Sequence, residues 1–300
     1  METVSLHETL PLFSRMVYGM WRLNDDSNTS DAHIIAKVEA CLEQGITTMD
    51  HADLYGDYEC EALYGRAMKS RPDLLAATQN VTKCGIKLIS DKYADRRVKH
   101  YDTSAAHIQA SAEQSLQKLG LDVIDLMLIH RPDPFMDPAE AGRALDDLVD
   151  SGKVRAVGVS NFKPWDWDLL QAHMHHPLVT NQIEINPMDT SCFRNGDIAL
   201  TQKLGLKPMA WSPLAGGAVF GESAQAQAIR KVMDPIAQQA GVGLDAVVVA
   251  WLMAHPAGIL PVMGTNNLDR IATLSDAFKV EIDRQTWFEI YEAAVGQEVP

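Results

Sequence analysis

Four ionisable side chains stand at the ends of three predicted strands, and together they can move a proton. Asp50 ends the run ITTMD, and Tyr55 follows it in HADLYG. Lys83 ends QNVTK, and His130 ends VIDLMLIH. Residues just past the carboxyl ends of parallel strands converge in one cleft. Tyrosine is a weak acid with an ordinary pKa of about 10, and a nearby ammonium group favours its phenolate. We therefore expect Lys83 to bring the pKa of Tyr55 closer to neutral pH.

Each of these four residues also has an ordinary structural interpretation. An aspartate at a strand end often caps a helix, and a tyrosine often packs in a core. The combination is more informative than any member, because an acid, a charge partner, a counter-charge and an orienting group are all present at strand ends.

The elements that must position these residues alternate along the chain. Short apolar segments predict strands at 16–20, 46–50, 75–82, 123–129, 154–159, 179–185, 207–211 and 259–263. Helical patterns lie between them, at 31–44, 57–69, 103–119, 138–151, 164–174, 196–204, 225–240, 244–254, 267–275 and 283–294. Eight strands alternating with helices predict a (β/α)8 TIM barrel, with a doubly wound sheet as the alternative. No linker-like stretch divides residues 1–300, so we expect a single domain.

Composition narrows the class of protein. The formal net charge of −14 argues against binding to duplex DNA or to an anionic membrane. No apolar run approaches the roughly 18 residues that span a bilayer, and the N-terminal sequence METVSLHETLPLF lacks the pattern of a signal peptide. Four cysteines without a CxxC pair favour reduced thiols and a cytoplasmic location: Cys41, Cys60, Cys84 and Cys192.

Six segments carry a family resemblance. ITTMDHADLYG, VTKCG, LMLIHRPDP, VRAVGVSNF, VTNQIEINP and MAWSPL occur in this order. Together they resemble the aldo-keto reductases, and within them a bacterial subgroup of oxidoreductases with HADLYG and IHRPDP motifs. The resemblance runs from about Ser14 to Ala294. It implies reduction of an aldehyde or ketone to an alcohol by NADPH, without a metal ion.

The resemblance also implies roles for the four strand-end residues. Tyr55 would give a proton to the carbonyl oxygen as hydride arrives from the nicotinamide C4. Lys83 and Asp50 would form a charged pair behind Tyr55. His130 would donate to the same oxygen and fix its direction.

Cofactor contacts follow from the same resemblance. Ser160, Asn161 and Gln182 would bind the nicotinamide carboxamide, and Trp211 would stack on the ring. The pyrophosphate would lie along Ser212, Pro213, Leu214 and Gly216, and Gly19 and Met20 would border the cofactor. The adenosine phosphate would contact Gly264, Thr265, Asn266 and Arg270. Structural alternatives stay open: turn capping for Ser160 and Asn161, an interior hydrogen bond for Gln182, core packing for Trp211 and a surface position for Arg270.

Two departures from the family pattern concern the phosphate site. Many members carry a lysine where this chain has Gly264. The acidic and amide residues that usually contact adenine are replaced by Thr273 and Leu274. Arg270 is then the one cation assigned to a 2′-phosphate, and it can pair with phosphate through two hydrogen bonds.

Substrate contacts are expected from Trp21 and Arg131, together with Tyr55 and His130. Arg131 has an alternative role in a salt bridge with Asp133. Segments 84–102, 131–137 and 212–224 would shape the pocket, since long loops are usually functional or mobile.

Two further patterns are weaker. GVGLDA matches the G-x-G-x-x-A dinucleotide pattern, but it stands between two helical segments, so we expect a helix–helix turn. His173, His175 and His176 lie at a helix end before Pro177, and no cysteine or carboxylate has a convincing spacing for a shared metal. No metal site is therefore expected.

Two rival functions remain. Some chains with this resemblance act as cofactor-sensing subunits of membrane channels and retain the same four residues. A metal-dependent barrel hydrolase using His130 and Asp50 is the other. The expected partner is a small-molecule carbonyl substrate, without nucleic acid or membrane, for a monomer or weak homo-oligomer.

Overall fold

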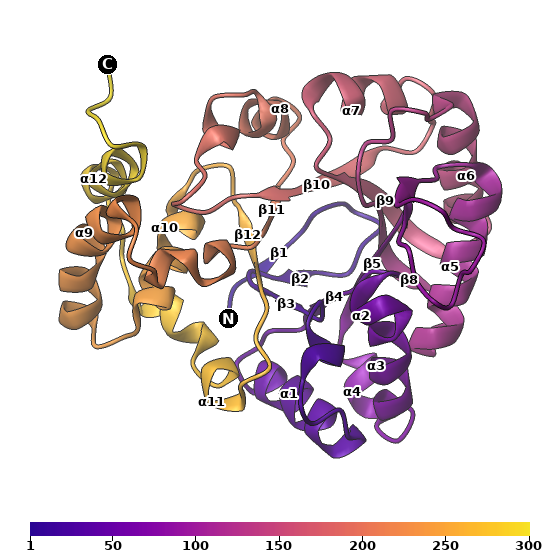
Figure 1. The fold of residues 1–300 in the computed structure, drawn as a ribbon, viewed down its shortest axis with the longest axis horizontal. Helices are drawn as coiled ribbons and strands as arrows, with labels where there is room; N and C mark the ends of the chain where they lie inside the picture. Colours follow the sequence, from indigo (N-terminus) through magenta and orange to yellow (C-terminus); the bar gives the residue numbers. More distant parts are fainter.

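The computed structural model describes residues 1–300, and its centre is a closed barrel of eight parallel strands (Figure 1). In chain order they are β3 (Val17–Gly19), β4 (Thr48–Asp50), β5 (Gln79–Cys84), β8 (Ile124–Ile129), β9 (Val154–Ser160), β10 (Leu178–Glu184), β11 (Met209–Trp211) and β12 (Leu260–Met263). Each strand pairs with the next, and β12 pairs with β3 to close the ring. The prediction of a (β/α)8 barrel is confirmed, and the doubly wound alternative is wrong.

One predicted strand is misplaced. The segment 75–82 was expected to be extended, but residues Pro72–Ala76 form a short helix, α4, and the strand begins at Gln79. Pro72 at the first helical position is pre-organised for a helix, and Leu74 is buried by it. The apolar residues at 74–77 therefore belong to the helix rather than to the strand.

Helices surround the barrel in the predicted places. They are α1 (Asp31–Glu43), α3 (Cys60–Met68), α5 (Ala105–Leu119), α6 (Pro138–Asp150), α7 (Pro164–Gln171), α8 (Asp197–Lys203), α9 (Ala224–Ala240), α10 (Leu244–Ala254), α11 (Leu268–Ile271) and α12 (Arg284–Val295). The side chains of Ser30, Ser104 and Asp137 accept backbone N–H groups at the starts of α1, α5 and α6. The predicted helix at 267–275 divides into α11 and a 3-10 turn, Leu274–Lys279.

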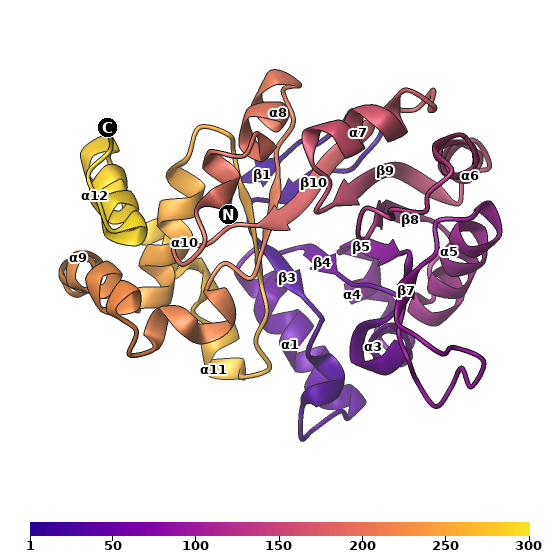
Figure 2. The same ribbon diagram turned by 45° about the horizontal axis from the view of Figure 1, so that its top comes forward.

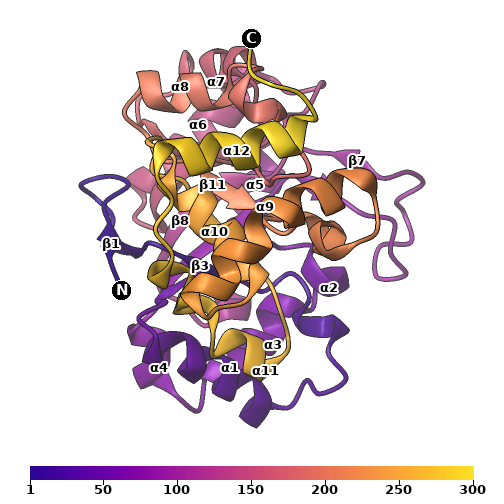
Figure 3. The same ribbon diagram turned by 90° about the vertical axis from the view of Figure 1, so that its left-hand side faces the viewer.

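The C-terminal helices form a layer of their own. Figures 1 and 3 show α12 packed along α9, with α10 nearer the barrel. Gly241 ends α9 with φ 67°, and Gly243 precedes α10, so the GVGLDA segment is the helix–helix turn that the sequence predicts. No single helix is long and apolar enough to cross a membrane; α9 and α10 together have the length, but they meet at 102°.

Two small antiparallel hairpins lie at opposite ends of the barrel (Figure 3). The N-terminal hairpin, β1 (Thr3–Val4) and β2 (Phe13–Ser14), was not predicted. Its Phe13 is fully buried in one cluster with Val17, Leu128 and Leu260, so the hairpin closes the end of the barrel at which the strands begin. The other hairpin, β6 (Ile86–Lys87) and β7 (His100–Tyr101), belongs to the long segment 84–102, which projects from the barrel in Figure 2.

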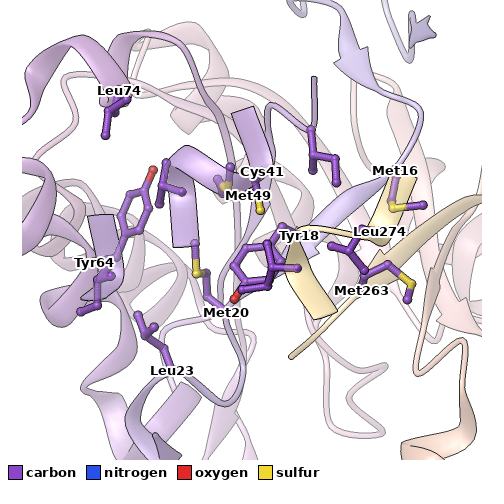
Figure 4. Close-up of a cluster of buried hydrophobic side chains, with 14 of the residues drawn as sticks. Met16, Tyr18, Met20, Leu23, Cys41, Met49, Tyr64, Leu74, Met263 and Leu274 are labelled. Carbon is purple, nitrogen blue, oxygen red and sulfur yellow. The ribbon is translucent and has the colours of Figure 1, made fainter. Parts of the chain in front are cut away.

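A further apolar cluster fills the space between the barrel and helices α1 and α3. Figure 4 shows part of it, with Tyr18 among Met20, Met49 and Met263. Met20 is only 2% exposed. The structure therefore places the Met20 side chain in the core, and it offers no open surface to a cofactor.

The segment that carries Tyr55 has an unusual backbone. After β4, residues Tyr55–Tyr58 form a single turn, α2, in which Gly56, Asp57 and Tyr58 all have positive φ, between 54° and 69°. A Cβ atom on Gly56 would lie 2.5 Å from Cβ of Asn24 and 2.6 Å from Sγ of Cys60. Position 56 therefore requires glycine, because its φ is positive and because no space is left for a side chain.

The first prediction concerns this turn. Gly56→Ala should lower the free energy of unfolding by clearly more than Gly120→Ala. Gly120 also has a positive φ, of 72°, but no atom lies within 4 Å of its ideal Cβ position, so it reports the backbone cost alone, about 1–2 kcal/mol. Urea denaturation of both variants measures the difference. Equal losses would mean that the neighbours of Gly56 move aside without cost.

Candidate active site

The ammonium group of Lys83 is the centre of the predicted site. Lys83 has no exposed surface, and its Nζ donates to Oδ1 and Oδ2 of Asp50, at 2.8 and 2.7 Å. It also donates to the carbonyl oxygen of His51, at 2.8 Å, and to Oη of Tyr55, at 3.0 Å. Asp50 ends β4 and Lys83 lies near the end of β5, the neighbouring strand. The register of two adjacent strands therefore brings the acid, the base and the phenol together.

The protonation of Tyr55 differs from the sequence-based expectation. Burial raises the pKa of Tyr55 above its ordinary value, and the nearby Lys83 only partly offsets this. Lys83 lowers the pKa of Tyr55, as the sequence analysis expects, but burial outweighs it and the net shift is upward. Burial alone would lower the pKa of Lys83, but Asp50 and Tyr55 raise it above its ordinary value. At neutral pH the site therefore holds a neutral phenol against a charged ammonium group.

His130 stands beside Tyr55 at the end of β8. The two ring centroids are 5.8 Å apart with an interplanar angle of 77°. Burial lowers the pKa of His130 well below its ordinary value, and the cations Lys83, Arg131 and Lys99 lower it further. The imidazole is therefore neutral, with one N–H to donate, and its buried Nδ1 has no hydrogen-bond partner within the protein.

Gln182 links this site to the next strand pair. Its Nε2 donates to Oδ1 of Asp50 at 2.7 Å, so the amide nitrogen is already engaged. Its backbone oxygen accepts from Oγ of Ser160, at 2.7 Å, and from the backbone nitrogen of Asn161, at 3.0 Å. The alternative interpretation of Gln182 as an interior hydrogen-bonding residue therefore holds for its nitrogen, and only Oε1 is left for a carboxamide.

Asn161 connects three of the predicted residues. It has a φ of 63°, and its Nδ2 donates to the His130 carbonyl oxygen at 3.2 Å. The same nitrogen donates to Oγ of Ser160, while Oδ1 accepts from Nε1 of Trp211 at 2.9 Å. The hydrogen bond from Nε1 therefore fixes the Trp211 side chain, which lies at the end of β11 and is partly exposed.

The segment after β11 has an open, turned backbone. Ser212, Ala215, Gly216 and Gly217 all have positive φ, between 52° and 99°. No atom lies within 4 Å of the ideal Cβ position of either glycine, so their backbone is accessible. Of the other predicted residues here, Pro213 is buried and Leu214 packs partly against two core clusters. A bound phosphate group would therefore meet backbone rather than side chains.

The predicted phosphate residues gather after β12. Gly264 is exposed, and a Cβ atom built on it would lie 3.7 Å from the Gly19 carbonyl oxygen. The carbonyl oxygen of Thr265 accepts a hydrogen bond from Oη of Tyr18 at 2.7 Å. Arg270 is exposed, and its guanidinium makes no hydrogen bond or ion pair within the protein. That free cation suits an anionic ligand.

A second cation in this region was missed. Lys37 donates from Nζ to Oδ1 of Asn266, at 3.0 Å, and forms an ion pair with Asp26. The sequence held one signal for it, because Lys37 follows Ile34 by three residues and so lies on the apolar stripe that continues with Val38. A buried lysine on such a stripe indicates a partner beyond its own helix.

The rim of the site carries opposite charges. Arg131 lies over the Trp211 ring, with its Cζ 5.4 Å from the centroid. The salt bridge suggested between Arg131 and Asp133 is absent, because Asp133 accepts from Oγ1 of Thr103 instead. Glu184 was not predicted. Burial raises its pKa, and Asn186 and Arg131 partly oppose that rise.

Trp21, the other predicted substrate residue, is 57% exposed, and its own ring is covered by Arg22, whose Cζ lies 5.0 Å from the centroid. A separate groove lies at the other end of the barrel, beside the N-terminal strand β1. Its basic residues are engaged, since Arg15 donates to backbone carbonyls and Lys207 donates to that of Ser5.

Comparisons with known proteins show which family and which fold this chain resembles. The model of the aldo/keto reductase family matches residues 15–294. A protein of Agrobacterium fabrum named 6-dehydroglucose reductase is 54% identical over 299 residues, covering 100% of both chains. Among solved structures, a glycerol dehydrogenase from Gluconobacter oxydans has a TM-score of 0.86 at 22% identity, covering 99% of this chain and 97% of its own. An aldo/keto reductase from Klebsiella pneumoniae, in complex with NADP and acetate, has a TM-score of 0.76 at 20% identity, covering 96% and 93%.

The second prediction concerns the buried ion pair. Lys83→Met should lower the free energy of unfolding by about 3–5 kcal/mol, because it leaves the buried carboxylate of Asp50 without its partner. Adding Asp50→Asn should recover part of that loss, since no uncompensated charge then stays buried. Chemical denaturation of the single and double variants gives both values. The explanation fails if the double variant is as unstable as the single one.

Proposed function

Since the chain belongs to the aldo/keto reductase family, we propose that it reduces an aldehyde or a ketone to an alcohol with NADPH as the hydride donor. The observation that carries the proposal is the hydrogen bond between Nζ of Lys83 and Oη of Tyr55, backed by the buried carboxylate of Asp50. It holds a protonated phenol against a fixed positive charge. Such a group can release a proton and have its anion stabilised at once.

The residues of the site divide the work. NADPH, when bound, supplies a hydride to the carbonyl carbon. Tyr55 gives its phenolic proton to the carbonyl oxygen, and Lys83 stabilises the phenolate that results. His130, neutral and able to donate one N–H, aligns the same oxygen. Asp50 keeps Lys83 protonated and is itself held by Gln182. The phenolate then recovers a proton from solvent.

Several features fit a dinucleotide phosphate. The exposed Arg270 has no partner of its own, and the backbone at Gly216 and Gly217 is accessible. Both suit negatively charged phosphate groups. The Klebsiella pneumoniae protein of the same fold was solved with NADP. We therefore assign Arg270 to the 2′-phosphate, with Lys37 holding Asn266 beside it.

The first substrate to test is a sugar aldehyde. The relative from Agrobacterium fabrum is named for reduction of 6-dehydroglucose. On the rim, Arg131 offers donors and Glu184 offers acceptors, which is what several hydroxyl groups require. Initial rates with a panel of sugar aldehydes and simple aldehydes, each with NADPH and with NADH, test the proposal. Cofactor binding without turnover on any of them would favour a cofactor-sensing protein instead.

The third prediction isolates the proton donor. Tyr55→Phe should lower kcat by about 10²–10⁴-fold, the usual contribution of general acid catalysis, and leave the dissociation constant of NADPH close to that of the wild type. Tyr291→Phe is the matched control, because the Tyr291 hydroxyl makes no hydrogen bond within the protein and its ring stacks on Trp287 in α12, away from the site. Wild-type turnover in Tyr55→Phe would remove this residue from the mechanism.

The fourth prediction concerns cofactor choice. The protein should bind NADPH about ten- to a hundredfold more tightly than NADH, and Arg270→Ala should remove most of that difference by weakening NADPH alone. Arg284→Ala is the control, since Arg284 is also exposed and unpaired in the first turn of a helix. Dissociation constants of both cofactors for each variant decide the matter. Equal weakening of NADPH and NADH would assign Arg270 to the adenine or to the fold, and a wild-type preference for NADH would contradict the phosphate assignment.

A further inference from the structure

Away from the tetrad of Asp50, Tyr55, Lys83 and His130, a cluster of histidines and carboxylates lies in the outer layer of the barrel. His175 and His176 lie between α7 and β10, and Asp146 and Asp150 lie one turn apart at the end of α6. The expectation that these histidines lack a carboxylate partner was wrong. The sequence did not reveal these partners, because they come from α6, 25 to 30 residues earlier in the chain.

Asp146 fixes the position of both histidines. Its carboxylate is 4% exposed, and its two oxygens accept the backbone N–H groups of His175 and His176, each at 3.0 Å. Oδ2 also lies 2.9 Å from Nδ1 of His175. This leaves Nε2 of His175 as the nitrogen that points away from the buried carboxylate. Histidines that bind metal ions are commonly held in this manner, with the second ring nitrogen on a carboxylate.

The free nitrogens of the two rings converge on Asp150. Nε2 of His175 lies 3.2 Å from Oδ2 of Asp150, and Nε2 of His176 lies 2.8 Å from Oδ1. The ring centroids are 4.4 Å apart. Ligand atoms about 2.0–2.2 Å from a tetrahedral ion lie roughly 3.3–3.5 Å from one another. The two nitrogen–oxygen separations are slightly below that value, so both imidazoles lie within reach of an ion held by Asp150.

The charge around the cluster also favours a cation. Helix α6 ends with Asp146, Asp147 and Asp150, and its last turn has no basic residue. Carboxylates at a helix C-terminus destabilise the helix, because that end of the helix dipole is already negative. The nearest following lysine, Lys153, pairs with Glu113 instead. A positive charge bound at Asp150 would relieve this repulsion.

We propose that Nε2 of His175, Nε2 of His176 and the carboxylate of Asp150 bind one Zn²⁺ ion per chain, with Asp146 holding His175 in place. Imidazole and carboxylate ligands suit Zn²⁺, and water would complete a tetrahedral set. The ion would tie the end of α6 to the start of β10. Because strands begin at the end of the barrel opposite to the tetrad, this is a structural site and is independent of the proposed carbonyl reduction.

An alternative arrangement needs no metal. Protonated imidazoles of His175 and His176 can pair with the two aspartates, as an ordinary surface network of charges. The two interpretations differ in what they require of Asp150 and His176, because only the metal site needs both on one ion.

The experiment is a calorimetric titration of ZnCl₂ into the full chain after treatment with a chelator. The wild type should take up one ion with saturation, and zinc should raise the midpoint of thermal unfolding. Asp150→Asn and His176→Gln, which change the size of the two side chains little, should each weaken uptake by at least about tenfold. His173→Gln is the matched control, because His173 is exposed on the same segment and contacts only the Leu169 carbonyl oxygen.

The outcomes are distinct. Loss of the saturable uptake in Asp150→Asn and His176→Gln, with retention in His173→Gln, supports the site. Absence of saturable uptake in the wild type up to about 1 mM zinc overturns it. So does uptake that is unchanged in both ligand variants, or lost equally in His173→Gln, since either result indicates adventitious ions only.

Discussion

An ammonium group that has no contact with water is the constraint on which the catalytic end of the barrel depends. Transferring a lysine charge and a carboxylate from water to the interior costs several kcal/mol for each ion. Lys83 recovers that cost by sharing its three N–H groups among four acceptors, namely both oxygens of Asp50, the His51 carbonyl and Tyr55. All four acceptors come from the end of β4 and the segment after it. A shift of one residue between β4 and β5 would leave the charge buried and unpaired, so the pair also defines the register.

The same pair determines when charge appears in the site. Burial keeps the Tyr55 phenol neutral, and Lys83 opposes that effect without reversing it. The positive charge is therefore in place before the proton leaves, and its attraction is greatest for the phenolate that forms afterwards. An environment organised in advance of the charge is what electrostatic catalysis requires. The neutral state of His130 fits this arrangement, since a third positive charge beside Lys83 and Arg131 is disfavoured there.

The parts of the structure that the sequence could predict are those set by local pattern. Apolar runs and caps such as Ser104 and Asp137 located the strands and helices, and strand ends located Tyr55, Lys83 and His130. The sequence could not predict the contacts between side chains that are far apart along the chain. The donation from Gln182 to Asp50 joins residues 132 apart, and the contact of Lys37 with Asn266 joins residues 229 apart. The Gln182 contact leaves no periodic trace in the chain, and the apolar stripe around Lys37 indicates that this lysine has a partner but not which residue it is.

The N-terminal hairpin has a consequence for how the chain folds during its synthesis. Phe13 shares the barrel interior with Leu260, and β3 finds its second neighbour only in β12, where Val17 pairs with Val262. Arg15 likewise donates to the Met253 carbonyl oxygen. The first strand of the barrel, β3, must wait for the last strand, β12, before its second edge is covered. Barrel closure therefore waits until β12 has emerged, and the nascent chain carries an open strand edge until then.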